Sequence, residues 1–208
     1  MSKKEKLAEL KKKALADKKL PLREGATNLV FGVGNPETKI LFIGEGPGYW
    51  EDIKAEPFVG NAGALLNRLL ASIELKREEV FITNMVMFRP PNNRDPEGEE
   101  LAAFAPYVDG IIKIIDPKVI VTLGRFSMAK FLPTARISSV HGQPQGVTWG
   151  GGEKELTVVP MYHPAAALRN GGILMQIQDD FKKLPAILLE IKNKTQSAKI
   201  KGEQIRLL

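Results

Sequence analysis

Apolar residues fall into four short, near-continuous runs, and amphipathic segments separate these runs. The runs cover residues 39–44, 80–86, 119–124 and 156–163. Because they do not alternate between apolar and polar residues, each is typical of a strand buried on both faces of a parallel sheet. Strands that alternate with helices indicate layered α/β architecture. The pattern therefore predicts a three-layer α/β/α fold with a central four-stranded parallel sheet.

Helical spacing of apolar residues predicts four helices in the body of the chain, over residues 62–71, 96–115, 125–131 and 175–191, where Pro185 can kink the last. Residues 1–19 are predicted to form a basic helix packed on a single domain that spans 20–191. Residues 192–208 are polar and basic, so we expect a disordered tail there. Residues 150–152 are three glycines, which predict the tip of a hairpin between 146–149 and Leu156.

Composition narrows the classes of protein. The chain has 208 residues, 43% of them hydrophobic, which is enough for one full core. It shows no apolar run of bilayer-spanning length and starts with a lysine-rich stretch, so we expect a cytoplasmic protein without membrane contact. The absence of cysteine excludes disulfides, thiolate metal sites, iron–sulfur clusters and a thiol nucleophile. With only two histidines, a zinc site is disfavoured.

The net charge of +6 and the pI near 9.4 favour a polyanionic partner. Much of this charge lies in the two terminal segments, where lysines are also typical of solvated helix faces. Charge alone therefore suggests nucleic acid but does not establish it.

A glycine-rich turn, Gly44–Gly48, follows the first strand. Its spacing is neither Gly-x-Gly-x-x-Gly nor a P-loop with its lysine and Ser/Thr. Glu45 and Glu51 stand where exposed backbone N–H groups would otherwise attract an anion. The turn is therefore better suited to a water molecule or a neutral ring than to a phosphate.

Three further side chains lie near predicted strand ends or in adjacent loops: Phe58, Asn84 and His163. Taken singly, a loop aromatic is usually core, an asparagine caps a turn, and a histidine is a satisfied, partly buried side chain. Parallel strands end at one edge of a sheet, so we expect all three to converge there. Together they predict a pocket for one planar polar ring.

These segments resemble the family 4, thermophile-type uracil-DNA glycosylases over about residues 20–190. The resemblance is carried, in order and with similar spacing, by the sequence of 44–52 with 57–63, by Thr83-Asn84 followed by 88–96, and by 163–170. It implies that the protein binds uracil-containing DNA and hydrolyses the bond between uracil and its sugar without cutting the strand. A related branch carries an inserted Lys-Arg-Arg-Ile-His segment, which this chain lacks.

The same resemblance implies a role for each matching residue. The catalytic set is Glu45, Glu51, Asn84 and His163, and the uracil-binding set is Gly44, Gly46, Phe58, Asn84 and His163. Of the two glutamates, we expect Glu45 to hold the water and Glu51 to face C5 of the base, although the pattern does not separate them. For DNA, the matches are Arg89, Arg94 and Arg169 as phosphate contacts and Leu168 as a wedge, unless Leu168 packs locally.

The chain departs from the family at the four cysteines that hold a [4Fe–4S] cluster in its members. Their positions fall on Phe88, near Phe104, and near Asp17 and Leu20. We expect no cluster, no metal and no cofactor, and a packed group of Leu20, Phe88 and Phe104 in place of the cluster. Tyr49 and Trp50 make the glycine-rich turn unusually aromatic, and they either pack on the domain or stack on a base.

Two other functions stay open at this point. The chain could be a non-catalytic DNA- or uracil-binding protein, although retention of Glu45, Asn84 and His163 argues against a decaying site. It could also be a nucleotide-binding α/β module, which the missing phosphate-loop spacing weakens. We expect a monomer in each case.

Overall fold

The computed structural model describes residues 1–152 and 154–206, without the side chains of Lys154 and residues 194–206. A six-stranded sheet in the order β1-β3-β2-β4-β6-β5 forms its centre. The strands are β1 (Val33–Gly34), β2 (Ile40–Gly44), β3 (Phe81–Asn84), β4 (Val119–Leu123), β5 (Gln145–Trp149) and β6 (Lys154–Met161). Neighbouring strands β3, β2, β4 and β6 are parallel, whereas the edge strands β1 and β5 are antiparallel to their neighbours.

Alternate residues of the parallel strands supply two separate hydrophobic cores. On β2, Leu41 and Ile43 belong to one core and Phe42 belongs to the other. Successive side chains of a strand point to opposite faces, so a strand that is apolar throughout must be covered on both sides. The near-continuous apolar runs thus have their physical explanation in a sheet enclosed between two helical layers.

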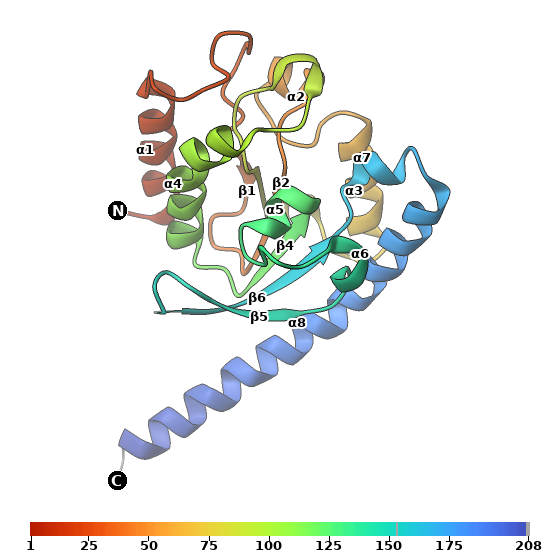
Figure 1. Ribbon diagram of the computed structural model, residues 1–208. Coiled ribbons are helices and arrows are strands. Elements are labelled where there is room, and N and C mark those ends of the chain that lie inside the picture. The colour runs from red at the N-terminus through yellow and green to blue at the C-terminus, as the bar shows by residue number, and fades with distance from the viewer. Residues whose placement is uncertain (153, 207–208) are drawn as a thin grey trace.

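Helices form the two outer layers (Figure 1). One core includes residues of α1 and α4, which contact each other, and the other core includes residues of α3, α7 and α8. The helices are α1 (Lys3–Ala16), α2 (Tyr49–Lys54), α3 (Asn61–Ala71), α4 (Gly98–Ile115), α5 (Arg125–Ala129), α6 (Ile137–Val140), α7 (Pro164–Ala167) and α8 (Gly171–Arg206), with the 3₁₀ turns η1 (Arg77–Glu79) and η2 (Pro91–Asn93). The predicted three-layer α/β/α class is confirmed.

The sheet differs from the prediction by its two edge strands. The four parallel strands are those expected, and β5 is the first arm of the predicted hairpin, paired with β6 from Gln145 to Trp149. Strand β1 has only two residues, so it is too short to produce a recognisable pattern in the sequence.

Helix α8 extends beyond the boundary that the sequence analysis gave. It includes Pro185 in its interior and continues to Arg206, although disorder was expected from residue 192 onward. Once packing of its first half has nucleated a helix, extending it through lysine, glutamine and alanine residues requires little free energy. The side chains of 194–206 and residues 207–208 lie outside the described part of the chain, and the domain boundaries stay a prediction.

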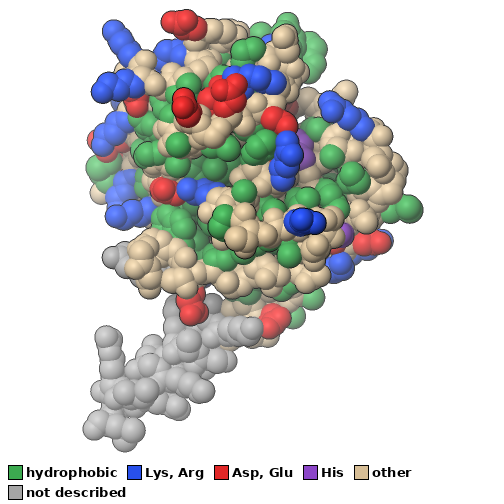
Figure 2. Space-filling view, viewed as in Figure 1, with side chains coloured by type: hydrophobic (Ala, Val, Ile, Leu, Met, Phe, Trp, Pro, Cys, Tyr) green, Lys and Arg blue, Asp and Glu red, His purple; other side chains and the backbone are tan. Residues whose placement is uncertain are grey.

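Basic and acidic side chains are interspersed on the face of the molecule shown in Figure 2, without a single field of one sign. Among the described residues, no helix has both the length and the apolar character needed to cross a membrane.

The N-terminal segment is fastened to α4 at the positions where the family's cysteines would fall. Phe88 and Phe104 are buried with their ring centroids 6.1 Å apart in a T-shaped arrangement, and Leu20 is buried in the same core. At the fourth position, the Asp17 carboxylate accepts a 2.7 Å hydrogen bond from the Tyr107 hydroxyl of α4. The expected apolar group is therefore present, joined by one polar contact.

Replacing Phe104 by alanine tests the contribution of this group. Phe104 is fully buried, so Phe104→Ala should lower the free energy of unfolding by about 3–5 kcal/mol through lost burial and a residual cavity. Urea denaturation followed by circular dichroism measures it. Phe126→Ala, at a half-buried phenylalanine outside the group, is the matched control and should cost clearly less. A loss below about 1 kcal/mol for Phe104→Ala would show that the group does not fasten α4.

Candidate active site at the carboxyl edge of the sheet

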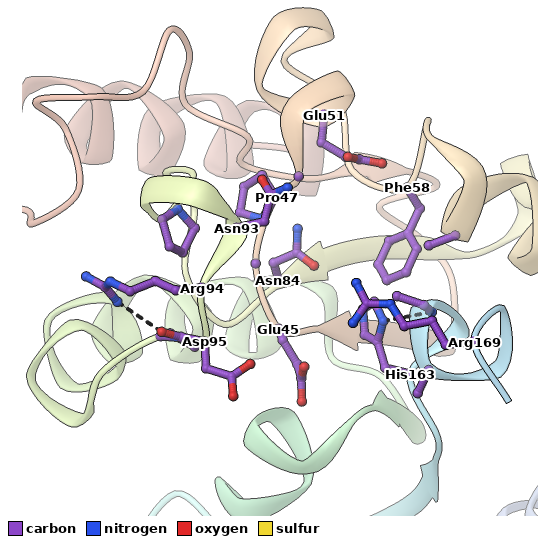
Figure 3. Close-up of a pocket in the computed structure, with 17 residues that line it drawn as sticks. Glu45, Pro47, Glu51, Phe58, Asn84, Asn93, Arg94, Asp95, His163 and Arg169 are labelled. Carbon is purple, nitrogen blue, oxygen red and sulfur yellow. Dashed lines mark hydrogen bonds between the residues drawn. The ribbon is translucent and has the colours of Figure 1, made fainter. Parts of the chain in front are cut away.

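A pocket of about 380 Å³ opens where the parallel strands end. Asn84 ends β3, Glu45 follows β2, and His163 lies two residues beyond β6. In Figure 3 the Asn84 side chain lies between Glu45 and Glu51. The pocket is lined by Glu45, Gly46, Pro47, Gly48, Glu51, Phe58, Ala62, Asn84, Pro90, Asn93, Arg94, Asp95, Pro96, His163, Ala165, Ala166 and Arg169. The strand ends thus bring together the side chains that the sequence predicted to converge.

Because Gly44 has no side chain, Asn84 and Phe58 can lie close together at the back of the pocket. Gly44 pairs with Asn84 across the parallel strands β2 and β3. A Cβ atom on Gly44 would lie 2.7 Å from Cε2 of the Phe58 ring and closer still to Oδ1 of Asn84. Gly44 does not itself line the pocket, and its contribution is to let these two side chains approach each other.

Phe58 is held in an unusual backbone conformation. Its φ is 54°, in the left-handed region that non-glycine residues rarely occupy. Its ring lies against His163, with centroids 5.6 Å apart and the planes 30° from parallel. Strained residues of this kind are typical of ligand sites, where the surrounding structure fixes them. The Phe58 ring therefore forms a rigid, flat wall beside His163 (Figure 3).

The Asn84 amide is the buried polar group that lacks a partner in this site. Asn84 is 1% exposed, and within the described part of the chain its Oδ1 accepts no hydrogen bond. Burying an unpaired acceptor costs about 1–3 kcal/mol, so native proteins seldom leave one. Because Asn84 lines the pocket, its Oδ1 is available to a hydrogen-bond donor that enters the pocket.

His163 is held as a neutral ring with a defined orientation. Its Nδ1 accepts a 3.1 Å hydrogen bond from the backbone N–H of Ala165, at the start of α7. An accepting Nδ1 leaves the proton on Nε2 in the neutral imidazole. Burial lowers the pKa of His163 to about 4, despite the opposing effect of the Glu51 carboxylate. At neutral pH the ring therefore offers one N–H donor and no charge.

Glu45 is anchored at the start of α5. Its Oε1 accepts a 3.1 Å hydrogen bond from the Phe126 N–H. Gly124, at φ 107°, permits this approach, because a Cβ there would overlap the Glu45 carboxyl group. Burial raises the pKa of Glu45, the Phe126 N–H opposes this rise, and the nearby Asp95 adds to it. A carboxyl group with a raised pKa in a cleft is typical of functional sites.

Glu51 is anchored at the start of a different helix. Its Oε1 accepts hydrogen bonds of 2.9 Å from Val59 and 2.8 Å from Gly60, the N-cap of α3. A carboxylate is stabilised there by the positive end of the helix dipole. The two glutamates therefore fix the two loops that border the pocket, and each also faces it.

The three predicted DNA-contacting arginines differ in their surroundings. Arg94 lines the pocket, but its guanidinium binds both oxygens of Glu100, at 2.9 and 2.6 Å. Arg89 lies outside the lining, where it donates from Nε to Asn93 Oδ1 at 2.7 Å. Arg169 is exposed and lines the pocket, whereas its chain neighbour Leu168 is 46% exposed and is not among the lining residues, so its role as a wedge stays a prediction.

Sequence reasoning missed Asn93 and Asp95, which also line the pocket. Asp95 forms an ion pair of 2.6 Å with Arg125. Both residues fall in the segment 88–96 that carried the family resemblance, so the signal was available. Asn92 and Asn93 adopt left-handed φ values of 53° and 54°, which asparagine tolerates well. A pair of adjacent asparagines was thus a sign of the tight loop that borders the site.

The site offers little to a metal ion. Among the described residues, no group of three or more histidine and acidic side chains is arranged to hold one. The chain has no cysteine, and the positions where the family resemblance implies cluster ligands are occupied mainly by buried apolar side chains. These residues do not fit an iron–sulfur cluster.

Fold and pocket together define a class of protein: an α/β/α domain with a pocket at the carboxyl edge of its sheet, in which an aromatic wall, a neutral histidine and a buried amide lie together. Comparison with known proteins identifies the family within this class. Residues 31–186 match the model of the uracil DNA glycosylase superfamily. A Type-4 uracil-DNA glycosylase of Sulfurisphaera tokodaii is 44% identical over 91% of this chain and 88% of its own length. Another, of Thermotoga maritima, is 46% identical over 72% and 77%. The chain belongs to the uracil DNA glycosylase superfamily.

The protonation state of His163 can be tested directly. In an NMR titration its ring should stay neutral from about pH 8 to pH 5 and titrate near 4, with the proton on Nε2. Since this pKa lies below the ordinary value of 6.5, acid between the two values protonates the unfolded chain first, so stability falls as pH drops through this window. The His163→Ala spectrum assigns the signals. A pKa of about 6–7, or a proton on Nδ1, would contradict the assignment.

Proposed function

We propose that this protein is a monofunctional uracil-DNA glycosylase of DNA repair, which hydrolyses the bond between uracil and deoxyribose and leaves an abasic site. The observation that carries the proposal is the unpartnered Oδ1 of Asn84, buried beside Phe58 and the neutral His163. Similarity to several Type-4 uracil-DNA glycosylases over most of the chain supports the same reaction.

Recognition of uracil follows from the donors and acceptors of the site. The N3–H of uracil donates to Asn84 Oδ1, and the amide nitrogen donates to O4. Cytosine presents an acceptor at N3 and a donor at its exocyclic amine, so both contacts would be mispaired. Leaving the buried amide unpaired costs about 1–3 kcal/mol, which discriminates between the two bases. Phe58 stacks on the flipped ring.

His163 stabilises the departing base. Negative charge grows on uracil as its bond to the sugar breaks, and Nε2–H of His163 donates to O2. The Ala165 contact already fixes the orientation of the ring, so this donor need not reorient as the charge develops. Backbone N–H groups of the turn 44–48 add further donors to the same ring.

A water molecule completes the reaction at C1′ of the sugar. The sugar becomes strongly electrophilic as the base departs, so the water needs orientation more than deprotonation. We assign the orientation of this water to Glu45. Its Oε1 accepts from Phe126, and its Oε2 takes no part in that contact. We assign Glu51 to the C5 side of the base, where a carboxylate fixed by the start of α3 would crowd the methyl group of thymine.

For DNA contact we assign Arg89 and Arg169 to backbone phosphates and Leu168 to the gap left by the flipped base. Arg94, paired with Glu100, holds the loop at the rim and contributes less to DNA affinity than the other two. We further propose that the protein acts as a monomer in the cytoplasm, on DNA that contains uracil.

We infer that activity requires no iron–sulfur cluster, because the chain lacks cysteine and packs Phe88 and Phe104 at two of the ligand positions. Iron and acid-labile sulfide assays on freshly purified, active protein should therefore give less than about 0.1 equivalent of each. Stoichiometric iron and sulfide in that preparation would disprove this inference.

The activity itself is tested with a labelled single-stranded oligonucleotide that contains one uracil. The strand should remain intact after incubation and break only after alkali, because hydrolysis leaves an abasic site. His163→Ala should lower the rate by about 10²–10³-fold, the usual effect of removing one donor to a developing negative charge. Gel electrophoresis and chromatography of released uracil measure the two products.

Two controls sharpen this test. The same oligonucleotide with cytosine in place of uracil should remain intact, since its base mispairs with Asn84. His141→Ala changes the other histidine, which is hydrogen-bonded to Asp180 and does not line the pocket, and should keep activity close to that of the parent. Strand cleavage without alkali would contradict a monofunctional enzyme. Tight binding with no uracil release would favour a non-catalytic binding protein.

A further inference from the structure

Two large aromatic side chains beside the lining of the pocket are about half exposed. Tyr49 and Trp50, the first residues of α2, are 50% and 56% exposed. They lie in the chain between Gly48 and Glu51, which both line the pocket. Leaving large rings exposed forgoes the stabilisation of burying them, so an aromatic pair beside a pocket indicates a contact surface.

This pair is held in place by contacts at its edges. The two rings meet edge to face, with centroids 5.2 Å apart and planes at 78°. The guanidinium of Arg89 lies 5.1 Å from the centre of the Tyr49 ring, and Arg89 is itself fixed by Asn93. Trp50 stands against the backbone at Gly60, where an added Cβ would come within 3.6 Å of its Cδ1. The pair is thus positioned by two different loops.

Both the position and the chemistry of the pair favour a nucleobase as its occupant. Bases of single-stranded DNA stack on exposed aromatic rings, and arginine commonly accompanies these rings as a phosphate contact. In a duplex the neighbouring bases are already stacked on each other and paired, so their faces are not available. Helix α2 and the loop that carries Arg89 border the same edge of the sheet as the pocket (Figure 1). A strand whose uracil occupies the pocket must pass close to this pair.

We propose that Tyr49 and Trp50 form a stacking platform for a base next to the uracil in single-stranded DNA, with Arg89 contacting the adjoining phosphate. This proposal rests on the proposed function, and it names single-stranded DNA as the preferred substrate of the site. The platform supplies affinity before the reaction and takes no part in breaking the glycosidic bond.

Intrinsic fluorescence isolates this platform. The chain has two tryptophans, and the other, Trp149, lies on the edge strand β5. In a Trp149→Phe background, Trp50 is the sole tryptophan reporter. Titration with a uracil-free, single-stranded thymidine oligonucleotide should quench its emission to saturation, because a stacked base quenches tryptophan. The same sequence as a duplex should quench it much less.

Fluorescence anisotropy measures how much each aromatic side chain contributes to DNA affinity. Trp50→Ala should weaken binding of the single strand by about tenfold and of the duplex by less than about threefold. Tyr49→Ala should weaken single-strand binding in the same direction. Ile53→Ala removes another exposed apolar side chain of α2, 45% exposed, and should change both affinities by less than about twofold. Tyr49, Trp50 and Ile53 are exposed, so circular dichroism should show the parent fold for these three variants.

The outcomes separate this proposal from the proposed function, because uracil-free DNA reports binding without reaction. Loss of single-strand affinity in Trp50→Ala supports the platform even if no uracil is ever released. Unchanged single-strand affinity in both aromatic variants overturns the platform while leaving an active glycosylase. An equal loss for single strand and duplex also overturns it, since that would be a general rim contact.

Discussion

The parallel register of β2 and β3, which sets Gly44 opposite Asn84, is the constraint on which the site depends. Parallel pairing brings successive strand ends to one edge, and the absent side chain at Gly44 leaves room there for the Asn84 amide and the Phe58 ring. Any larger residue would push these groups apart. The sheet thereby fixes the buried amide, and its Oδ1 is left without a partner among the described residues.

Two half-buried carboxylates hold the loops around this amide. Glu45 accepts from the N–H of Phe126 at the start of α5, and Glu51 accepts from Val59 and Gly60 at the start of α3. Each uses only part of its hydrogen-bonding capacity on the protein. The same residues can therefore hold the walls of the pocket and act on its contents, which explains why acids occupy a turn that otherwise resembles an anion site.

Much of the fold and of the pocket could be predicted from sequence, for a physical reason. Strands buried on both faces must be apolar throughout, and polar residues at their ends, such as Asn84 and His163, then stand out clearly. Contacts that depend on loop geometry leave no such signal, either between distant segments, as for Arg89 over Tyr49, or within one loop and the helix that follows it, as for Arg94 and Glu100. Strand β1, with two residues, is too short for periodicity to identify.

The packed group of Leu20, Phe88 and Phe104 also influences the shape of the pocket. Leu20, Phe88 and Phe104 are held in one core by contacts that require close fit. Phe88 lies directly before the loop of Arg89 and Asn93, so the same packing that fastens the N-terminal segment also fixes one rim of the pocket. Because hydrophobic contacts act through shape, a cavity at Phe104 would loosen this rim as well as the fold. Stability and the geometry of the rim are therefore coupled through one group of side chains.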